Sequence, residues 1–307
     1  MERGADSVIG RFAPSPTGRM HLGNIYTALL SWLSAKSKGG RWLLRIEDLD
    51  PQRSRHEYAM QLMDDLHWLG LEWDGEPLWQ SERTDIYSKH FSMLQQQKLV
   101  YPCYCSRADI LGAAGAPHES DGRVVYPGTC RRLFEEQAES AVRTDEPPTR
   151  RDNGRHPAWR LIVPNKTIVF TDGHCGEQSY NLARHCGDFV VRRSDGVFAY
   201  QLAVVVDDAL SGVTEVVRGE DLLLSTAQQI YLYRLFGYKI PHFCHLSLLR
   251  NAAGQRLSKR DKAQDMSYLR THYTAEQIVG MVAYKAGLTQ TEAPINLQEL
   301  LTQTNVG

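Results

Sequence analysis

The sequence has almost no net charge. Its 35 lysines and arginines stand against 36 aspartates and glutamates, which gives a formal net charge of −1. A balance this close to zero provides no overall attraction to nucleic acid or to an anionic membrane, so any contact with RNA has to come from local patches. The chain also has no apolar run near the roughly 18 residues that span a bilayer, and residues 1–10 lack the pattern of a secretory signal. We therefore expect a cytoplasmic protein with no membrane partner.

Internal repeats and long low-complexity runs are absent as well, and the 307 residues have the composition of one large or two ordinary globular domains. Only six cysteines are present, and in a reducing compartment they are not expected to form a disulfide framework. Three of them cluster, at Cys103, Cys105 and Cys130, which suggests a metal site. The others, with the histidines beside two of them, have no ligand-like spacing and are interpreted as packing or surface residues: Cys175, Cys186, Cys244, His174 and His185.

Alternating strand and helix signals open the chain. Residues 7–12 and 42–47 are predicted strands, and residues 21–35 form a predicted helix after a rigid, proline-rich turn. Asp50 is expected to cap a second helix, with Pro51 at its first position. Strand, helix, strand and helix in this order predict an α/β fold with a parallel sheet.

The pattern changes after residue 100, where the cysteine cluster and polar stretches indicate an inserted subdomain. Beyond it a helix is expected over 222–236, and the strand candidates cover residues 159–163, 166–171, 189–192, 197–206 and 213–217. Two of these, 189–192 and 197–206, are predicted to form a hairpin around Asp195-Gly196. The predicted division is a first half of an α/β domain over 1–100, an insertion over 101–157, the second half over 158–262 and a short helical segment over 263–307.

The segment Arg11–Asn24 joins the first predicted strand to the first predicted helix through two prolines and a glycine. A helix N-terminus offers unpaired N–H groups and a partial positive charge to phosphates. Gly23 would let an adenine or ribose lie against the backbone there, and His21 could donate a hydrogen bond to a triphosphate oxygen. The alternative is a stiff turn before a core helix, with His21 acting only as the cap, and the residues by themselves leave both open.

A second basic element, residues 251–260, is a turn of small residues followed by Arg256, Lys259 and Arg260. A lysine on such a loop can place positive charge against the oxygens of a leaving pyrophosphate. At about 4 Å and an effective dielectric of about 20, one such charge pair contributes about 4 kcal/mol before desolvation. Taken without other information, the segment is better interpreted as a solvated surface turn.

Together the two elements, His21-Leu-Gly-Asn24 and Arg256-Leu-Ser-Lys-Arg260, resemble the HIGH and KMSKS signatures of class I aminoacyl-tRNA synthetases. Segments 11–18 and 45–50 resemble the glutamate branch, and the similarity runs in order from residue 9 to about residue 262. The second signature departs from the pattern at Leu257, in place of methionine, and at Arg260, in place of serine. The resemblance implies a Rossmann-like, doubly wound parallel sheet with an inserted zinc-bearing subdomain and a short helical C-terminal segment.

The same resemblance implies roles for individual residues. His21 and Lys259 would be catalytic, and the ATP site would comprise His21, Gly23, Asn24 and Lys259, with Mg²⁺ accompanying the nucleotide. The glutamate pocket would comprise Arg11, Phe12, Ala13, Pro14, Ser15, Glu47, Tyr200 and Arg218. The chemistry fits, because Glu47 is a natural partner for an ammonium and an arginine can hold a side-chain carboxylate with charge-assisted hydrogen bonds. For each of these residues an ordinary ion pair at a strand end is the alternative.

The cysteine cluster supplies three soft ligands, whereas a structural zinc site needs four. From the residues alone, His118 or a water is as good a fourth ligand as Tyr126. Shortened relatives of glutamyl-tRNA synthetase have a C-x-C pair followed by Y-x-x-x-C, which resembles Tyr126–Cys130 here and implies Cys103, Cys105, Tyr126 and Cys130 as ligands of one structural Zn²⁺.

Only about 45 residues follow the KMSKS-like segment, so we expect no anticodon-binding domain. In this respect the chain resembles the glutamyl-queuosine tRNA(Asp) synthetases, which implies a ligase with ATP, L-glutamate and queuosine-containing tRNA-Asp as partners. Separately from the resemblance, we expect a monomer. Three alternatives remain: a compact glutamyl-tRNA synthetase that charges a tRNA 3′ end, another nucleotidyltransferase with a HIGH signature, and a non-catalytic regulatory paralogue. Segment 45–50 and the cysteines argue against the second, and the set His21, Glu47, Arg218 and Lys259 argues against the third.

Overall fold

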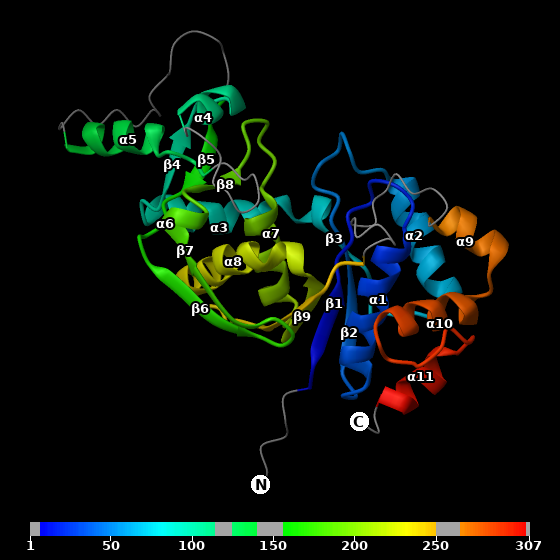
Figure 1. Ribbon diagram of the computed structural model, residues 1–307. Helices are drawn as coiled ribbons and strands as arrows, with labels where there is room; N and C mark the ends of the chain where they lie inside the picture. The colour runs from blue at the N-terminus through cyan, green and yellow to red at the C-terminus, as the bar shows by residue number, and fades with distance from the viewer. Residues whose placement is uncertain (1–6, 114–124, 140–155, 250–264, 305–307) are drawn as a thin grey trace.

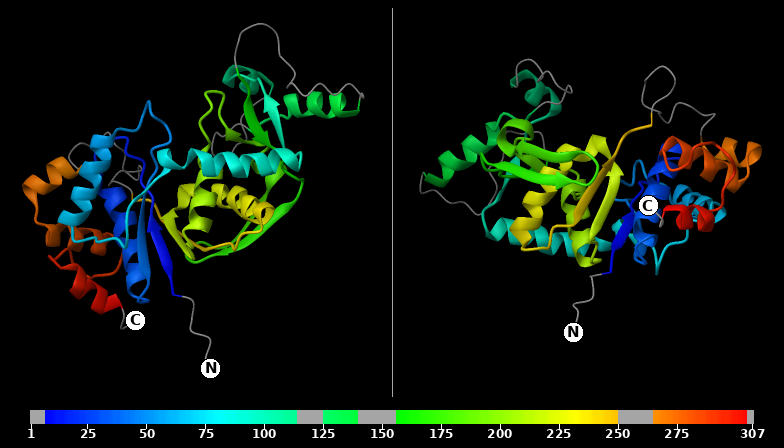
Figure 2. Two further views of the ribbon diagram at one scale, coloured as in Figure 1. Left: turned by 180° about the vertical axis from the view of Figure 1, so that it is seen from behind. Right: turned by 60° about the horizontal axis from the view of Figure 1, so that its bottom comes forward.

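The computed structural model describes residues 7–113, 125–139, 156–249 and 265–304 (Figure 1). Helices α9–α11 and the pair α4 and α5 lie at opposite ends of the molecule in all views (Figures 1 and 2). None of the helices in the described ranges is long and apolar enough to cross a membrane. The first half of the chain contains β1 (Ile9–Phe12), α1 (Leu22–Lys36), β2 (Arg41–Ile46), α2 (His56–Trp68), β3 (Leu78–Trp79), α3 (Thr84–Gln96), β4 (Val100–Cys103), α4 (Arg107–Ala113) and α5 (Thr129–Glu139).

The second half of the chain also alternates between strands and helices, and it contains more strands than the first half. It contains β5 (Ala158–Leu161), β6 (Thr167–Asp172), β7 (Gly176–Asn181), α6 (Leu182–His185), β8 (Phe189–Arg192), α7 (Tyr200–Leu210), β9 (Glu215–Gly219), α8 (Leu223–Phe236), β10 (His242–Leu246), α9 (Met266–His272), α10 (Ala275–Lys285) and α11 (Leu297–Thr304). Strands β4, β5 and β8 form an antiparallel sheet, and β6 pairs with β7 in an antiparallel hairpin.

The centre of the molecule is built from parallel strands. β1 pairs with β2 and β2 with β3, all parallel, and β9 pairs with β10 in parallel as well. The two groups meet where the Thr214 backbone N–H donates to the Ile9 carbonyl at 2.9 Å and the Ile9 N–H donates to the Thr214 hydroxyl at 2.9 Å. The parallel sheet predicted from the alternation of strands and helices is therefore confirmed.

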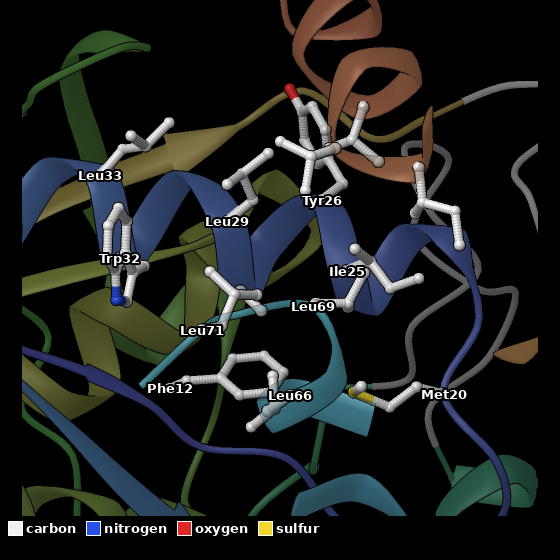
Figure 3. Close-up of a cluster of buried hydrophobic side chains, with 14 of the residues drawn as sticks. Phe12, Met20, Ile25, Tyr26, Leu29, Trp32, Leu33, Leu66, Leu69 and Leu71 are labelled. Atoms are coloured by element: carbon white, nitrogen blue, oxygen red, sulfur yellow. The ribbon is translucent and has the colours of Figure 1, made fainter. Parts of the chain in front are cut away.

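The sheet lies between two hydrophobic clusters. Along β2 the side chains alternate, so that Trp42 and Leu44 join the cluster around α1, whereas Leu43 packs against the cluster around α7 and α8. Figure 3 shows the first cluster, in which Tyr26, Leu29 and Leu33 extend from one side of α1 and Phe12, Leu66 and Met20 lie on its other side. Full burial of each such side chain stabilises the fold by about 1.5–3 kcal/mol. Because both faces are covered, the strands read as nearly continuous apolar runs.

Most predicted elements exist with boundaries shifted by one or two residues, but the strand predicted over 197–206 is wrong. Residues Tyr200–Leu210 form α7, and the predicted hairpin is reduced to one bridge between Arg192 and Phe198 beside the turn. Helix α7 is buried on nearly every side, so its sequence has no polar face to reveal the helical period. A β-branched run in such a helix has the composition of a buried strand.

The predicted start of the second helix is also wrong. Asp50 does not cap a helix with Pro51 at its first position, because α2 begins at His56. The Asp50 carbonyl instead accepts hydrogen bonds from the N–H groups of Arg53 and Ser54, which closes a separate turn. The next residue, Arg55, donates its N–H to the Pro16 carbonyl at 3.0 Å. The turn therefore ties the end of β2 to the loop that follows β1.

Candidate functional site

A cavity of about 480 Å³ opens at the carboxyl ends of β1, β2 and β9. Polar side chains at this edge are common in parallel sheets, because neighbouring strands all end there. The cavity lining brings together every residue of the predicted glutamate pocket: Arg11, Phe12, Ala13, Pro14, Ser15, Glu47, Tyr200 and Arg218. Further lining residues that the sequence analysis did not assign to the pocket include Asp50, Arg53, Ser54, Val217 and Leu222.

A buried ionic network adjoins this cavity, and two of its members, Arg11 and Glu47, line it. The Asp208 carboxylate, on α7, accepts hydrogen bonds from Arg11 at 3.4 Å and from Arg45, and Arg45 also pairs with Glu47 at 3.1 Å. Burial alone would raise the pKa of Asp208, but the charges of Arg45 and Arg11 outweigh it and hold that pKa below its usual value. Burial raises the pKa of Glu47 against the opposing charges of Arg45 and Arg11. The pairing of Glu47 with the Arg45 guanidinium favours the ionised form of the carboxylate.

Arg218 also lines the cavity and is 4% exposed. Its Nη2 donates to Thr226 Oγ1 at 2.7 Å, its Nε donates to His245 Nε2 at 3.1 Å, and its Nη1 lies 3.4 Å from the Tyr200 hydroxyl. Within the described ranges no carboxylate forms an ion pair with Arg218. Burial lowers the pKa of this guanidinium from its usual value, as expected for a cation whose charge is not neutralised by a neighbour. The cavity therefore contains a buried positive charge that a bound anion could neutralise.

A second cavity of about 310 Å³ adjoins the first, since Asn24, Thr27, Gly219 and Leu222 line both. His21 and Gly23 line its other side, together with residues 246–249. The two cavities are thus arranged for two ligands that meet near the start of α1.

His21 caps helix α1, as one of the two alternatives predicted. Its Nδ1 accepts a hydrogen bond from the Gly23 N–H at 3.1 Å, and Asn24 Oδ1 accepts one from the His21 N–H at 3.1 Å. A Cβ atom at Gly23 would lie 3.0 Å from the imidazole Cε1, so the glycine makes room for the His21 ring itself.

The KMSKS-like segment falls outside the described residues, and so do Lys259, Arg256, Arg260 and His118. The described residues on either side of it both adjoin the second cavity. Leu249 lines that cavity, and Asp265 forms a β-bridge with His21. The Met266 N–H also donates to the Met20 carbonyl at 2.8 Å.

Three of the six cysteines lie together, with their sulfur atoms within 4.8 Å of one another. The Cys105 and Cys130 sulfurs are 3.5 Å apart, and the Tyr126 hydroxyl lies 3.5 Å from the Cys103 sulfur and 3.8 Å from the Cys105 sulfur. A tetrahedral zinc, with Zn–S and Zn–O distances of about 2.3 and 2.0 Å, has edges of about 3.8 Å between sulfurs and about 3.5 Å between sulfur and oxygen. The four side chains therefore have the chemistry and the spacing of a tetrahedral metal site.

Arg160 compensates the negative charge that such a site would carry. Its Nε donates to the Cys103 sulfur at 3.2 Å, and its guanidinium lies over the Tyr126 ring at 3.9 Å from the centroid. The Tyr126 oxygen also accepts a hydrogen bond from the Cys130 N–H at 2.8 Å. The remaining cysteines, Cys175, Cys186 and Cys244, are partly buried and belong to no such group among the described residues.

Sequence reasoning did not identify four buried polar residues that hold the cavity walls: Asp172, Asp208, Thr226 and His245. Asp208 could have been found, because an acidic residue within an apolar helical run is buried at a cost unless it is paired. The contacts of Asp172 and His245 depend on β6 lying beside the end of β10, and no local pattern predicts that neighbourhood.

Comparison with known proteins places these features in a family. Residues 7–306 match the family model described as tRNA synthetases class I (E and Q), catalytic domain. The chain is 47% identical over 303 residues to a glutamyl-Q tRNA(Asp) synthetase from Symbiobacterium thermophilum, covering 95% of this chain and 90% of that protein. It is 45% identical over 294 residues to one from Nitratidesulfovibrio vulgaris, covering 93% of this chain and 88% of that protein.

Solved structures agree with the family match. A glutamate tRNA ligase from Elizabethkingia meningosepticum, solved in complex with its amino acid, aligns with a TM-score of 0.75 at 28% identity over 96% of this chain. A glutamate-tRNA synthetase from Elizabethkingia anophelis aligns with a TM-score of 0.76 at the same identity. The chain spans 64% and 65% of the lengths of these two proteins, respectively.

Proposed function

The chain belongs to the glutamyl-Q tRNA(Asp) synthetases, within the class I family of glutamate and glutamine tRNA synthetases, and we propose that it activates L-glutamate with ATP and transfers it to queuosine in tRNA-Asp. The observation that carries this proposal is the buried Arg218, which forms no ion pair with a carboxylate in the part of the chain that the structure describes. The positive charge of Arg218 favours an anion in the cavity beside it, and the side-chain carboxylate of glutamate is such an anion.

The charges around the cavity favour glutamate over glutamine. Of the described residues that line the cavity, three are arginines, Arg11, Arg53 and Arg218, and two are acids, Glu47 and Asp50, which leaves one positive charge. Glutamate carries two carboxylates and one ammonium, so its binding neutralises this charge, whereas glutamine carries no net charge and leaves it unpaired. Hydrogen bonds to charged groups contribute about 1.5–3 kcal/mol each, which is enough for a preference of about 10- to 100-fold.

The remaining polar groups fit the two ends of the amino acid. Glu47 lines the same cavity and offers a carboxylate for the ammonium of glutamate. The Tyr200 hydroxyl, next to Arg218, offers a hydrogen bond to the side-chain carboxylate. An ammonium bound near Glu47 also favours the ionised form of that carboxylate, which offsets the effect of its burial.

ATP would occupy the second cavity, which the HIGH-like residues His21, Gly23 and Asn24 line. The α-carboxylate of glutamate then attacks the α-phosphorus of ATP, the bond to pyrophosphate breaks, and glutamyl-adenylate forms. Mg²⁺ accompanies the nucleotide, and we assign Lys259 to the leaving pyrophosphate because the described residues flanking its segment adjoin this cavity. A queuosine hydroxyl attacks the mixed anhydride in the second step and releases AMP.

We assign Zn²⁺ to Cys103, Cys105, Tyr126 and Cys130, on the strength of their donor set and distances. The ion would be structural, since four protein ligands leave no open position for a substrate. It would fix β4 to the segment that follows α4, where only a small apolar cluster is present.

The wider organisation follows from the same proposal. We divide the chain into two halves of a Rossmann-type catalytic domain, over 1–100 and 158–262, a zinc-bearing insertion over 101–157 and a helical segment over 263–307. A monomer is sufficient, because residues of a single chain line both cavities. A tRNA substrate places the protein in the cytoplasm.

Transfer of labelled glutamate tests this function. The protein, ATP and labelled glutamate are incubated with tRNA-Asp that contains or lacks queuosine, or with tRNA-Glu, and the label is located by nuclease cleavage. We expect label on the anticodon fragment, and only when queuosine is present. Label at the 3′ end of tRNA-Glu would instead identify a compact glutamyl-tRNA synthetase, and absence of any transfer would contradict the proposal.

A further inference from the structure

Behind Arg218 lies a buried imidazole that the proposed reaction does not use directly. His245, at the end of β10, is 0% exposed and lies between Arg218 and Asp172, the last residue of β6. Its Nδ1 is 2.5 Å from Asp172 Oδ2, and its Nε2 is 3.1 Å from Arg218 Nε. The Asp172 carboxylate is itself fixed, since its other oxygen accepts backbone N–H groups of His174, Cys175 and His245 at 2.9–3.0 Å.

These contacts determine the protonation of the ring. An ionised carboxylate can only accept, so the proton shared with Asp172 belongs to Nδ1 of His245. A guanidinium Nε–H can only donate, so Nε2 of His245 must carry a lone pair. Burial, followed by the charge of Arg218, lowers the pKa of His245 to about 4, which agrees with a neutral ring. The imidazole is thus a neutral acceptor aimed at Arg218.

We propose that His245, held by Asp172, is a positioning residue that orients the Arg218 guanidinium for the side-chain carboxylate of glutamate. Two of the three guanidinium nitrogens are engaged behind the cavity, Nε by His245 and Nη2 by Thr226. The third, Nη1, lies toward Tyr200, which lines the cavity. The guanidinium is therefore fixed in one plane before any ligand arrives, which lowers the entropy cost of binding.

A histidine suits this position better than an acid would. A carboxylate in contact with Arg218 would orient it but would also neutralise it, and the ligand would then gain little from its own charge. The neutral imidazole orients the guanidinium and leaves its charge for the ligand. Asp172 fixes the ring without touching Arg218, because the imidazole stands between them.

Two substitutions separate the functions of the two ring nitrogens. His245→Asn retains an amide near Nδ1 that can donate to Asp172, but it does not reach Arg218. His245→Gln reaches the position of Nε2 and can accept from Arg218, but it loses the bond to Asp172. We expect the dissociation constant for glutamate to rise about 10- to 100-fold in His245→Asn and less than about threefold in His245→Gln, because only the asparagine removes a hydrogen bond to a charged group.

Calorimetric titration with glutamate measures both constants, and titration with ATP should show little change in either variant. His90→Asn and His90→Gln are the matched controls, because His90 is also a buried histidine with both ring nitrogens in hydrogen bonds, to Ile86 and Tyr238. They should leave glutamate binding unchanged. Equal losses of glutamate affinity in the two His245 variants, a larger loss in His245→Gln, or no loss in His245→Asn would overturn the inference.

A measurement on the unaltered protein covers the case in which the variants fail to fold. The ¹⁵N chemical shifts of His245 should identify a neutral ring protonated at Nδ1 at neutral pH, with and without glutamate. A charged ring or the opposite tautomer would refute the role of His245. The inference rests on the proposed function, but different results would contradict the two. If the unaltered protein does not bind glutamate, the proposed function is contradicted. The tautomer of the imidazole tests the role of His245 alone.

Discussion

Arg11 and Asp208 form a buried ion pair, with Arg11 Nε 3.4 Å from Asp208 Oδ1, although 197 positions separate them in the sequence. Arg11 lies on β1 and Asp208 on α7, so the pair joins the first parallel strand to the helix that precedes β9. Arg45 of β2 bonds to the same carboxylate oxygen. One acidic side chain therefore holds both Arg45 and the cavity-lining Arg11 in place, and the shape of the cavity depends on it.

Replacing Asp208 by asparagine should destabilise the fold. The variant Asp208→Asn keeps the size of the side chain but leaves two buried arginines without their shared charge partner, which costs about 3–5 kcal/mol of unfolding free energy. Chemical denaturation at neutral pH measures this loss. Asp195→Asn is the control, because Asp195 is 43% exposed and its pair with Arg193 should contribute no more than about 1 kcal/mol. Similar losses in both variants would contradict this role of Asp208.

Arg218→Met should impair glutamate use specifically. Methionine approximates the length of the arginine stem but removes the charge, so kcat/KM for glutamate in ATP–pyrophosphate exchange should fall about 100-fold or more. The KM for ATP should change little, because Arg218 does not line the second cavity. Arg41→Met, at the opposite end of β2, serves as the control. A fall that appears mainly in the KM for ATP would refute the assignment of Arg218 to the amino acid.

The stability of the fold should decrease as the pH is lowered, because of the titration of His245. Its pKa is lowered from 6.5 to about 4 in the folded protein, first by burial and then by the charge of Arg218. Between these values the unfolded chain binds a proton that the folded protein does not, so stability is lost as pH falls from about 6.5 toward 4. From pH 7 to pH 5 this group should remove about 2 kcal/mol from the unfolding free energy.

Comparing His245→Gln with the unaltered protein isolates that contribution, because glutamine does not titrate. Denaturation at the two pH values should give a smaller difference for the variant. The same pH dependence in both proteins would show that other groups cause it.

Purified protein should contain about one zinc per chain. Cys130→Ser removes a thiolate ligand and should abolish binding, whereas Tyr126→Phe removes only the oxygen ligand and should weaken it, and both should lower thermal stability. Metal analysis after dialysis measures the content, and Cys186→Ser, outside the cluster, should retain the ion. Zinc loss in Cys186→Ser, or a zinc-free unaltered protein, would contradict the assignment.

Local signals in the sequence predicted the parallel strands and the first helix well. Arg11–Asn24 shows a buried strand, a stiff turn and a capped helix within a few residues, and the structure has all three. The residues predicted for the glutamate pocket all line one cavity, because each lies at or just after the carboxyl end of a parallel strand or at a helix start. Such positions can be located without knowing how the whole chain folds.

Features that depend on distant packing could not be predicted in this way. Val204 to Val206 suggested a strand because helix α7 is surrounded on all sides and shows no polar face. Pro51 suggested a helix start, but the turn closed by the Asp50 carbonyl and the bond between Arg55 and Pro16 delay the helix to His56. The partnership of His245 with Asp172 requires the ends of β6 and β10 to meet, which only the folded chain reveals.

Exchange between ATP and labelled pyrophosphate, measured without tRNA and with glutamate or glutamine as the amino acid, tests the central claim most directly. If a buried, uncompensated Arg218 selects the amino acid, glutamate should support exchange and glutamine should be at least about 10-fold less effective in kcat/KM. Exchange that is absent with glutamate, or equal with both amino acids, would contradict the account of this cavity.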